Sequence, residues 1–512
     1  MTSFRGELPM TFSRLIADVR GRAPEVLGAP HVLGAPRQPS GDPVITALVH
    51  DHRTVTAGAL FVARKGERFD GHEVIAQALE RGAAAVIGER PPVELSVELG
   101  AVPYLRVPDS RRALPFLAAA FHEHPSERLR VIGVTGTDGK TTTSFLLHRI
   151  LEGRYRSGLI STAGVRLGSQ EGALLGHFTT PEATDVQRLL AEFAAAGARH
   201  AVLESSSHGF SLNRLDAVSY AAGVVTNVSP EHLDHHKTLS AYLDAKATLV
   251  KRAARAVINL DDEHRQAFLE AAKSAGSEIV TYGQHRDADV RLGKVTDVPG
   301  GLLFELVAGG EATTVKLPLI GGYNAWNAAA AMAVTLGEGI SLAEAAARLE
   351  SFSGVPGRMQ VLQAEPFTVV VDFAHTAPAL AKALAAVRRE RGRVIVVIGA
   401  AGERDPGKRA PLGSAAVGGA DLVIFTEEDS RSEPFSLIAA ELKRGALAAG
   451  GSENGDFVII QERERAIAEA LHRAGDGDVV VLAGKGHERT LERSDEVIAW
   501  DEAALARRLL AG

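Results

Sequence analysis

Apolar runs alternate with amphipathic stretches through the last third of the chain. From residue 368 the order is TVVVDF, PALAKALAAVRRE, RVIVVIG, KRAPLGSAAVG, DLVIFT, FSLIAAELKRGALAAG, DFVII, RERAIAEALHRAG and DVVVLAG, followed by a last helical stretch. Unbroken apolar runs of this length are typical of strands buried on both faces of a parallel sheet. The pattern predicts a doubly wound, Rossmann-like α/β domain over residues 355–512, with ligands bound at the carboxyl ends of its strands.

The same alternation continues towards the N-terminus. RVIGVT at residues 130–135 is an apolar run followed by the helical stretch TTTSFLLHRILEG, and HAVLE, AAGVVTN and RAVINL predict further strands. These elements predict a central parallel-sheet domain over residues 109–354. Before it, VTAGALFVARKG and HEVIAQALERGAAAVIG predict a strand, a helix and a strand in a small α/β domain over residues 1–108. A Pro- and Gly-rich stretch between residues 21 and 43 predicts irregular structure.

Length and composition agree with three domains. The 512 residues exceed what one hydrophobic core holds, roughly 250–300 residues. A net charge of −7 and an aromatic content of 5% argue against nucleic-acid and anionic-membrane partners. The absence of cysteine excludes disulfides, zinc–thiolate sites and cysteine nucleophiles. With no signal-peptide pattern and no apolar run of about 18 residues, we expect a cytoplasmic protein, and take a monomer as the default.

The strongest chemical signal is a glycine-rich loop between a buried strand and a helix, GVTGTDGKTTT at residues 133–143. Backbone N–H groups of such a loop and the following helix N-terminus bind phosphate, the lysine neutralises it, and the next hydroxyl binds Mg²⁺. Val134 stands where the standard P-loop has its first glycine, so a turn without a ligand is the alternative. The candidate ATP-binding residues are Gly136, Thr137, Asp138, Gly139, Lys140, Thr141 and Thr142.

This loop resembles that of the Mur ligase family, whose members join a carboxylate to an amine with ATP. Further motifs follow in the family's order: LESSSHG, TNVSPEHLDHH and AYLDAKATLV, beginning at residues 203, 226 and 241. The resemblance implies two Mg²⁺ ions held by Thr141, Glu204, His232 and a carbamylated Lys246, and it makes Lys140, Lys246 and His232 the catalytic candidates. A solvated polar turn and an ordinary surface lysine are the structural alternatives for the last two motifs.

Three later motifs resemble the family's nucleotide-side positions. GGYNAWNAAAAMAV, GVPGRMQ and VVVDFAHT begin at residues 321, 354 and 369. By the resemblance they add Asn324, Asn327, Arg358, Asp372 and His375 to the ATP-binding candidates. Helix capping by the two asparagines would explain the first motif equally well.

The first segment resembles that of the ligase that adds the third peptide residue to UDP-N-acetylmuramoyl-L-alanyl-D-glutamate. His52 replaces a serine and Leu212 a glutamine of the family pattern, which puts those substrate contacts in doubt. The implied substrate-binding residues are Asp51, Arg53, Gly71, His72, Thr179, Thr180, Ser206 and Arg214.

The last segment resembles the amino-acid site of the same ligase. The implied binding residues are Arg404, Glu428, Asp429, Arg431, Gly484 and Glu488. Arg431 suits a distal carboxylate, as in meso-diaminopimelate, because guanidinium pairs with carboxylate in two parallel hydrogen bonds. Glu428 and Asp429 suit a distal ammonium instead. On this balance L-lysine or L-ornithine is slightly favoured over diaminopimelate.

The resemblance therefore implies an ATP-dependent amide ligase of peptidoglycan precursor synthesis. Its partners would be the UDP-muramoyl-dipeptide and a diamino acid, its cofactors ATP and Mg²⁺, and its intermediate an acyl phosphate. A D-Ala-D-Ala-adding or polyglutamate-type ligase is the alternative within the family. A nucleotide-dependent switch protein is the alternative outside it, and a second metal site would argue against that reading. A small-molecule kinase would leave the third domain unexplained.

Overall fold

The computed structural model describes residues 10–28, 42–66, 69–172, 179–298, 300–494 and 496–511. The chain divides into two compact units, Met1–Ala288 with Ala333–Glu338, and Asp289–Met332 with Gly339–Gly512. Much of the Pro- and Gly-rich stretch lies outside the described residues. Among the described residues, no helix is both long and apolar enough to cross a membrane.

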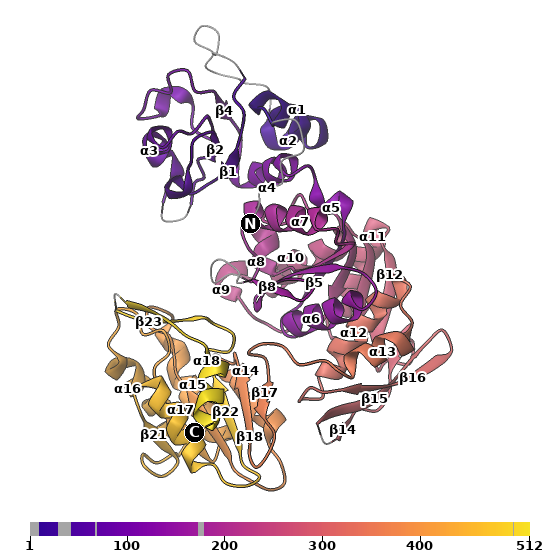
Figure 1. Ribbon diagram of the computed structural model, residues 1–512, viewed down its shortest axis with the longest axis vertical. Coiled ribbons are helices and arrows are strands. Elements are labelled where there is room, and N and C mark those ends of the chain that lie inside the picture. Colours follow the sequence, from indigo (N-terminus) through magenta and orange to yellow (C-terminus); the bar gives the residue numbers. More distant parts are fainter. Residues whose placement is uncertain are drawn as a thin grey trace. The chain divides into compact units, whose positions relative to one another are not determined.

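The first unit begins with a small four-stranded parallel sheet (Figure 1). Apolar side chains of this sheet pack on both faces, against α1, α2 and α4 on one and against α3 on the other. The strands are β1 (Ala47–Val49), β2 (Ala59–Val62), β3 (Ala85–Gly88) and β4 (Tyr104–Arg106). The helices are α1 (Phe12–Arg22), α2 (Pro24–Leu27), α3 (Ile75–Glu80) and α4 (Ser110–Phe121), with 3₁₀ turns η1 (His52–Thr54), η2 (Gly71–Val74) and η3 (Pro92–Glu94).

The larger sheet of this unit has the order β12-β11-β10-β5-β9-β6-β7-β8. It is parallel as far as β6, and β7 and β8 add an antiparallel edge. The parallel strands are β5 (Arg130–Thr135), β6 (Ser157–Ser161), β9 (His200–Glu204), β10 (Tyr220–Val225), β11 (Ala253–Asn259) and β12 (Glu278–Gly283). The edge strands are β7 (Gly164–Leu167) and β8 (Gln170–Gly172).

Helices cover this larger sheet because their apolar residues recur at helical spacing. Those of α7 pack on β5, β6 and β9 around Phe193, and those of α10 and α11 pack on β10 and β11 around Phe268. The helices are α5 (Pro125–Arg128), α6 (Lys140–Glu152), α7 (Ala183–Ala195), α8 (Ser207–Ser211), α9 (Leu233–His236), α10 (Leu239–Arg252) and α11 (Arg265–Ala275).

The second unit contains a small antiparallel group and a six-stranded sheet. In the antiparallel group, β15 (Gly301–Ala308) pairs with β13 (Val290–Leu292), β14 (Thr296–Val298) and β16 (Glu311–Leu317). Helix α12 (Asn324–Gly337) begins in this unit and ends in the first, and α13 (Leu342–Leu349) follows it.

The six-stranded sheet has the order β17-β18-β22-β19-β20-β21, with β17 antiparallel to its neighbour and the other pairs parallel. Its strands are β17 (Gln360–Gln363), β18 (Thr368–Asp372), β19 (Val394–Ile398), β20 (Leu422–Phe425), β21 (Phe457–Ile459) and β22 (Val479–Ala483). Helices α14 (Ala377–Val387), α15 (Arg409–Gly419) and α16 (Phe435–Ala448) cover one face. Helices α17 (Arg463–Arg473) and α18 (Glu502–Leu510) cover the other.

The predicted alternation of strands and helices is confirmed in this sheet. The predicted doubly wound domain is therefore present, and the central parallel sheet is confirmed with an added antiparallel edge. The sequence patterns did not reveal the hairpin β23 (Thr490–Arg493) and β24 (Glu496–Ala499), nor the 3₁₀ turn η4 (Pro406–Lys408).

Candidate functional site

The glycine-rich loop joins the end of β5 to the start of α6. Gly136 and Gly139 have φ angles of +146° and +83°. A Cβ atom on Gly136 would lie 1.9 Å from the Thr226 hydroxyl oxygen, so a side chain does not fit. The turn thereby brings the first N–H groups of α6 to the carboxyl end of the sheet, the arrangement that binds phosphate.

Lys140, the first residue of α6, turns its side chain back onto this loop. Its ammonium donates hydrogen bonds to the carbonyl oxygens of Gly136 and Thr137, at 3.1 and 2.8 Å. The loop carbonyls therefore hold a positive charge over the phosphate-binding turn. Thr142 is partly exposed in the same first helical turn.

Residues from the neighbouring strand end hold the loop in shape. The Thr226 hydroxyl donates to the Asp138 carbonyl (2.6 Å), and the side-chain oxygen of Asn227 accepts from the Asp138 N–H (3.0 Å). The carbonyl of Asn227 accepts from the Thr137 N–H at 2.7 Å. We had not selected these two residues. Their place directly after β10, which pairs with β5, was the available signal.

Glu204, at the end of β9, is 1% exposed and lies beside the loop. One carboxylate oxygen accepts from the Thr141 hydroxyl (3.0 Å). The other accepts from the Ser161 hydroxyl (2.8 Å) and the Thr162 N–H (2.9 Å). The structure thus brings the two predicted oxygen ligands together.

Lys246, on α10, is buried rather than on the surface, so the surface-lysine alternative is wrong. Its ammonium donates to the carbonyl of Gly136 at 2.5 Å and lies 4.4 Å from the centre of the Tyr242 ring. Burial, reinforced by the positive charge of Lys140, holds the pKa of Lys246 well below its ordinary value. A neutral amine at this position can react with carbon dioxide, as carbamylation requires.

His232 occupies a left-handed turn, with φ of +55°, before α9. Its side chain is 46% exposed, and its Nε2 lies 3.7 Å from a carboxylate oxygen of Glu231. Its ring centre is 4.7 Å from that of His208, a residue of the LESSSHG motif that we had not selected. Burial, followed by the charges of neighbouring histidines, lowers the pKa of His208 to about 4.

Magnesium prefers oxygen ligands, and the set beside the loop offers them. The Thr141 hydroxyl and the Glu204 carboxylate are in contact, and a carbamate on Lys246 would add an anionic oxygen. Within the described ranges, no three or more His, Asp or Glu side chains form a metal-binding group. The predicted set contains two such residues, Glu204 and His232, and the oxygens present for Mg²⁺ are those of Thr141 and Glu204.

The other side of Glu204 carries three predicted substrate-binding residues. The Thr180 hydroxyl donates to the Glu204 carbonyl (2.9 Å) and lies 2.9 Å from the Ser206 hydroxyl. Arg214 donates to the Thr180 carbonyl at 2.8 Å. Thr179 is partly exposed immediately before them.

Glu182 anchors this group, although it is not among the predicted residues. It follows Thr179 and Thr180 in the stretch TTPEAT, residues 179–184. Its carboxylate pairs with Arg214 at 2.8 Å and with Arg64, of the N-terminal sheet, at 2.7 Å. Burial alone would raise the pKa of Glu182, but the charges of the two arginines lower it. The carboxylate therefore joins the loop after β2 to the substrate-side residues.

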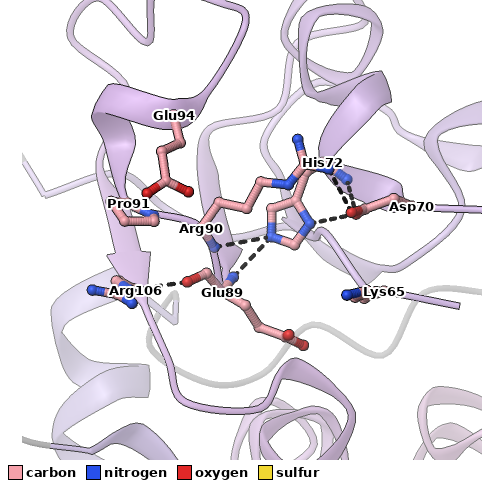
Figure 2. Close-up of a pocket in the computed structure, with 8 residues that line it drawn as sticks. All are labelled: Lys65, Asp70, His72, Glu89, Arg90, Pro91, Glu94 and Arg106. Atoms are coloured by element: carbon pink, nitrogen blue, oxygen red, sulfur yellow. Dashed lines mark hydrogen bonds and ion pairs between the residues drawn. The ribbon is translucent and has the colours of Figure 1, made fainter.

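The N-terminal sheet carries a pocket of about 300 Å³ at the carboxyl ends of β2, β3 and β4. Figure 2 shows the predicted residue His72 in its wall, beside Asp70. The Nε2 of His72 accepts from the Glu89 N–H (2.8 Å), so the ring proton is on Nδ1, which is 2.5 Å from an Asp70 oxygen. Against the effect of burial, hydrogen bonds from His72 and Arg90 lower the pKa of Asp70 to about 2. The pocket is lined by Lys65, Asp70, His72, Glu89, Arg90, Pro91, Glu94 and Arg106.

Gly71, beside His72, packs so closely on the preceding strand end that a Cβ would lie 2.8 Å from the Arg64 nitrogen. Asp51 follows β1, and hydrogen bonds from Arg53 lower its pKa to about 2. The ring centre of His52, which replaces the family's serine, lies 6.4 Å from that of Phe69, and the two ring planes differ by 27°.

In the second unit, most of the predicted nucleotide-side residues form hydrogen bonds with backbone groups of nearby residues. Asn324 donates to the Ile320 carbonyl (2.8 Å) and accepts from Asn327 (2.9 Å) at the start of α12. Asp372 accepts from the N–H groups of Met359 and Ala374, at 2.7 and 2.9 Å.

Asp372 is buried, and burial raises its pKa. Beside it, the guanidinium carbon of Arg358 lies 4.6 Å from the centre of the Phe373 ring. His375 is exposed, with its Nδ1 at 2.9 Å from the Phe373 carbonyl.

Five of the predicted amino-acid-binding residues lie at the carboxyl ends of β20 and β22 and the turns that follow them. Gly484 has φ of +100°, and a Cβ there would lie 2.9 Å from a Glu428 carboxylate oxygen. That oxygen is buried without a hydrogen-bond partner among the described residues, and burial raises the pKa of Glu428. Arg404 is exposed on the loop after β19.

Lys485 occupies the centre of this group and had not been selected. It is fully buried, and its ammonium lies 2.8 Å from Asp429 and 2.6 Å from Glu488. Arg431 is held by Glu492, at 2.8 Å, on the hairpin β23–β24. Lys485 lies in the stretch AGKGHE, residues 483–488, between the predicted residues Gly484 and Glu488, and this position was a signal for it. Glu492 lies in a hairpin that the sequence pattern did not reveal.

Comparison with known proteins finds three family models along the chain. The "Mur ligase family, catalytic domain" matches residues 44–122, the "Mur ligase middle domain" residues 134–335, and the "Mur ligase, glutamate ligase domain" residues 357–486. Each match falls on one of the three sheets that carry the residues above.

Two curated relatives and one solved structure match nearly the full length. A UDP-N-acetylmuramyl-tripeptide synthetase of Roseiflexus sp. (strain RS-1) is 44% identical, over 94% of this chain and 97% of the relative. A UDP-N-acetylmuramoyl-L-alanyl-D-glutamate–2,6-diaminopimelate ligase of Geobacillus thermodenitrificans is 39% identical, over 91% and 95%. A solved structure of a ligase with that second name has a TM-score of 0.65 and 30% identity, covering 98% of this chain and 99% of that one.

The family models match in the family's own order, and the Roseiflexus relative is similar from end to end. The three sheets are accordingly an N-terminal, a central and a C-terminal domain of one α/β architecture. The chain belongs to the Mur ligase family.

Proposed function

We propose that this ligase adds a diamino acid to the D-glutamate residue of UDP-N-acetylmuramoyl-L-alanyl-D-glutamate, a step of peptidoglycan precursor synthesis. The names of the Roseiflexus and Geobacillus relatives support this substrate, and of the two only the second specifies the amino acid. The family uses ATP, and the phosphate loop supports that role here. A cytoplasmic location and a monomeric state stay predictions.

The observation that carries the proposal is the position of Glu204 between two groups of residues. Its carboxylate accepts from Thr141 of the phosphate loop, and its backbone carbonyl accepts from Thr180 of the substrate-side group. A carboxylate substrate held by Thr180, Ser206 and Arg214 would therefore lie next to bound phosphates. Such proximity is what direct attack on a γ-phosphoryl group requires.

The reaction proceeds in two steps. An oxygen of the substrate's γ-carboxylate attacks the γ-phosphorus of ATP, and the bond to ADP breaks, which gives an acyl phosphate. The α-amine of the diamino acid then attacks the acyl carbon, loses a proton and expels phosphate. Lys140 neutralises charge on the transferring group, and Arg214 orients the carboxylate. Mg²⁺, held by Thr141, Glu204, His232 and carbamylated Lys246, would supply further charge neutralisation when bound.

The amino acid would bind to the C-terminal domain. Arg404 is exposed and forms no ion pair within the described residues, which suits an α-carboxylate. Glu428, Asp429, Arg431, Gly484 and Glu488 would surround the rest of the molecule.

Phosphate release measures this activity directly. The purified chain is incubated with ATP, Mg²⁺, the UDP-muramoyl-dipeptide and, in separate reactions, L-lysine, L-ornithine and meso-diaminopimelate. We expect phosphate release that requires both the dipeptide and one of these amino acids, with the tripeptide product confirmed by mass. Absence of release with all three would reject the proposal. Release only with the UDP-muramoyl-tripeptide and D-Ala-D-Ala would assign the alternative family activity.

A further inference from the structure

Lys485 and Arg431 are cations among the amino-acid candidates of the C-terminal domain, and each is already paired with acidic side chains. Lys485 is fully buried between Asp429, at 2.8 Å, and Glu488, at 2.6 Å. Two carboxylates against one ammonium leave no positive charge there for a ligand carboxylate. The net charge of Lys485, Asp429 and Glu488 together is therefore negative.

Arg431 is the other cation, and Glu492 occupies it. Its Nε donates to a Glu492 carboxylate oxygen at 2.8 Å, and one terminal nitrogen donates to the Gly402 carbonyl at 2.7 Å. The Asp429 carboxylate lies 3.9 Å from the other terminal nitrogen. The two side chains of the pair are only 19% and 23% exposed, so the interaction is weakly screened by solvent.

The hairpin that carries Glu492 also fixes the backbone of Arg431. Arg431 has φ of +52°, a conformation that costs a non-glycine residue free energy. Its N–H donates to the Glu492 carbonyl at 3.1 Å, and its own carbonyl accepts from the Ser494 N–H at 2.5 Å. The Glu492 N–H in turn donates to Asp429 at 3.0 Å. Two backbone hydrogen bonds, and a third from the Glu492 N–H to the Asp429 carboxylate, therefore hold the Glu492 segment beside Arg431.

Glu428 adds a further acid, on which the charges of His375, Arg463 and Lys485 act. One of its oxygens is buried with no hydrogen bond among the described residues, and it lies against the position that a Cβ of Gly484 would take. Burying a polar atom unpaired costs free energy, which a ligand donor would recover. An ammonium group on the ligand meets this need, and a carboxylate does not.

We propose that Glu492 is a specificity-determining residue, which neutralises Arg431 so that the site selects a diamino acid whose side chain ends in an ammonium group alone. L-ornithine and L-lysine belong to this class. Meso-diaminopimelate carries an additional distal carboxylate, which would meet an arginine already paired and three surrounding acids. This inference rests on the proposed function, because it assumes that the group binds the incoming amino acid.

The test compares kcat/KM for L-ornithine, L-lysine and meso-diaminopimelate in the wild-type enzyme and in Glu492→Gln. The substitution keeps the shape and removes the charge. We expect the wild type to prefer ornithine or lysine over diaminopimelate by at least about tenfold, and Glu492→Gln to shift the ratio about tenfold towards diaminopimelate. Because a merely structural loss would lower all three values together, the ratio isolates selectivity.

Two further variants make the result specific. Glu496→Gln removes an exposed carboxylate of the same hairpin and should leave the ratio unchanged. Arg431→Gln, added to Glu492→Gln, should abolish the gain for diaminopimelate, since the gain requires the freed guanidinium. A wild-type preference for diaminopimelate, an unchanged ratio in Glu492→Gln, or an equal shift in Glu496→Gln would overturn the inference and leave the proposed function standing. No turnover with any of the three amino acids would overturn both.

Discussion

In the proposed reaction, much of the chemistry depends on the side chain of Lys140. Its ammonium is the positive charge directly above the phosphate-binding turn, where two loop carbonyls orient it. We expect Lys140→Ala to reduce ATP-dependent phosphate release by a factor on the order of 10³ or more, because charge on the transferring group would lose its neutralising partner. The fold should remain intact, since the side chain only touches the loop.

Phosphate release and thermal unfolding, followed by circular dichroism, together check this prediction. Lys273→Ala, at an exposed position on α11, is the matched control and should change neither. Near-wild-type turnover in Lys140→Ala would contradict the role given to this loop.

Lys246 makes a second prediction at the same scale. Its low pKa and its burial beside the loop favour a neutral amine, which can attack the carbon of CO₂ and lose a proton to give a carbamate. We expect Lys246→Ala to lose activity by about 10²-fold or more, and acetate to restore part of it by supplying a carboxylate in the vacated space.

Carbonate-depleted buffer should lower wild-type activity, and added bicarbonate should restore it. Mass spectrometry under native conditions should show the mass of one CO₂ on the wild type but not on Lys246→Ala. Full activity in Lys246→Ala, or wild-type activity indifferent to bicarbonate, would contradict carbamylation.

At the scale of elements, the end of α12 is tied to the central sheet by one buried carboxylate. Glu338 pairs with Arg130, on β5, at 2.5 Å and with His200, on β9, at 2.9 Å. Burial alone would raise the pKa of Glu338, but hydrogen bonds from His200 and Arg130 lower it to about 2. The carboxylate therefore connects the end of α12 to β5 and β9 at the amino ends of these strands. The phosphate loop lies at the opposite, carboxyl ends.

Glu338→Gln should lower the free energy of unfolding at pH 7 by about 1–3 kcal/mol, the usual size for hydrogen bonds to charged groups. Because the pKa of Glu338 is lower in the folded chain than in the unfolded one, its contribution is fully present above the unfolded value. It is lost as the pH falls from about 4.5 towards 2. The difference between wild type and variant, measured by urea unfolding, should therefore shrink over this range. A difference independent of pH would contradict the assignment.

Elements with a strong pattern of apolar residues could be predicted from the sequence, and elements held in place by tertiary contacts could not. RVIGVT and HAVLE became β5 and β9 without change of bounds, because a strand buried on both faces shows itself as an unbroken apolar run. The strands of the hairpin β23–β24, TLER and EVIA, show no regular alternation of apolar and polar residues. The hairpin is stabilised partly by its hydrogen bonds to the Arg431 loop. Nothing local signals such a pairing.

The same distinction between local sequence pattern and tertiary contact applies to the residues of the candidate site. Motifs identified residues such as Glu204, at the end of β9, and Thr180, shortly before α7. They did not identify the partners that fix them, such as Glu182, Asn227 and Glu492, because a partner's role depends on which distant residue it meets. Sequence also could not decide whether Lys246 was buried, since the helix that carries it exposes other polar residues.

At the scale of the whole molecule, the C-terminal sheet has cores on both of its faces. One packs around Phe425 and Leu442 under α14, α15 and α16, and the other around Ile467 and Leu505 under α17 and α18. Among the residues of these two clusters and those packed against them, only Ile320 comes from before residue 354. The proposed domain boundary near residue 354 therefore leaves both cores almost complete.

A fragment of residues 354–512 should consequently fold by itself. We expect a single cooperative urea transition, and circular dichroism with the helix and strand content of this domain, because a chain of this length with two complete cores can offset its conformational entropy. A longer fragment from residue 289, which restores Ile320 and the antiparallel strands of the same compact unit, should be more stable by about 1–2 kcal/mol, as burial of one large apolar side chain predicts. If only the longer fragment unfolds cooperatively, the domain begins with those strands, and the boundary near residue 354 is wrong.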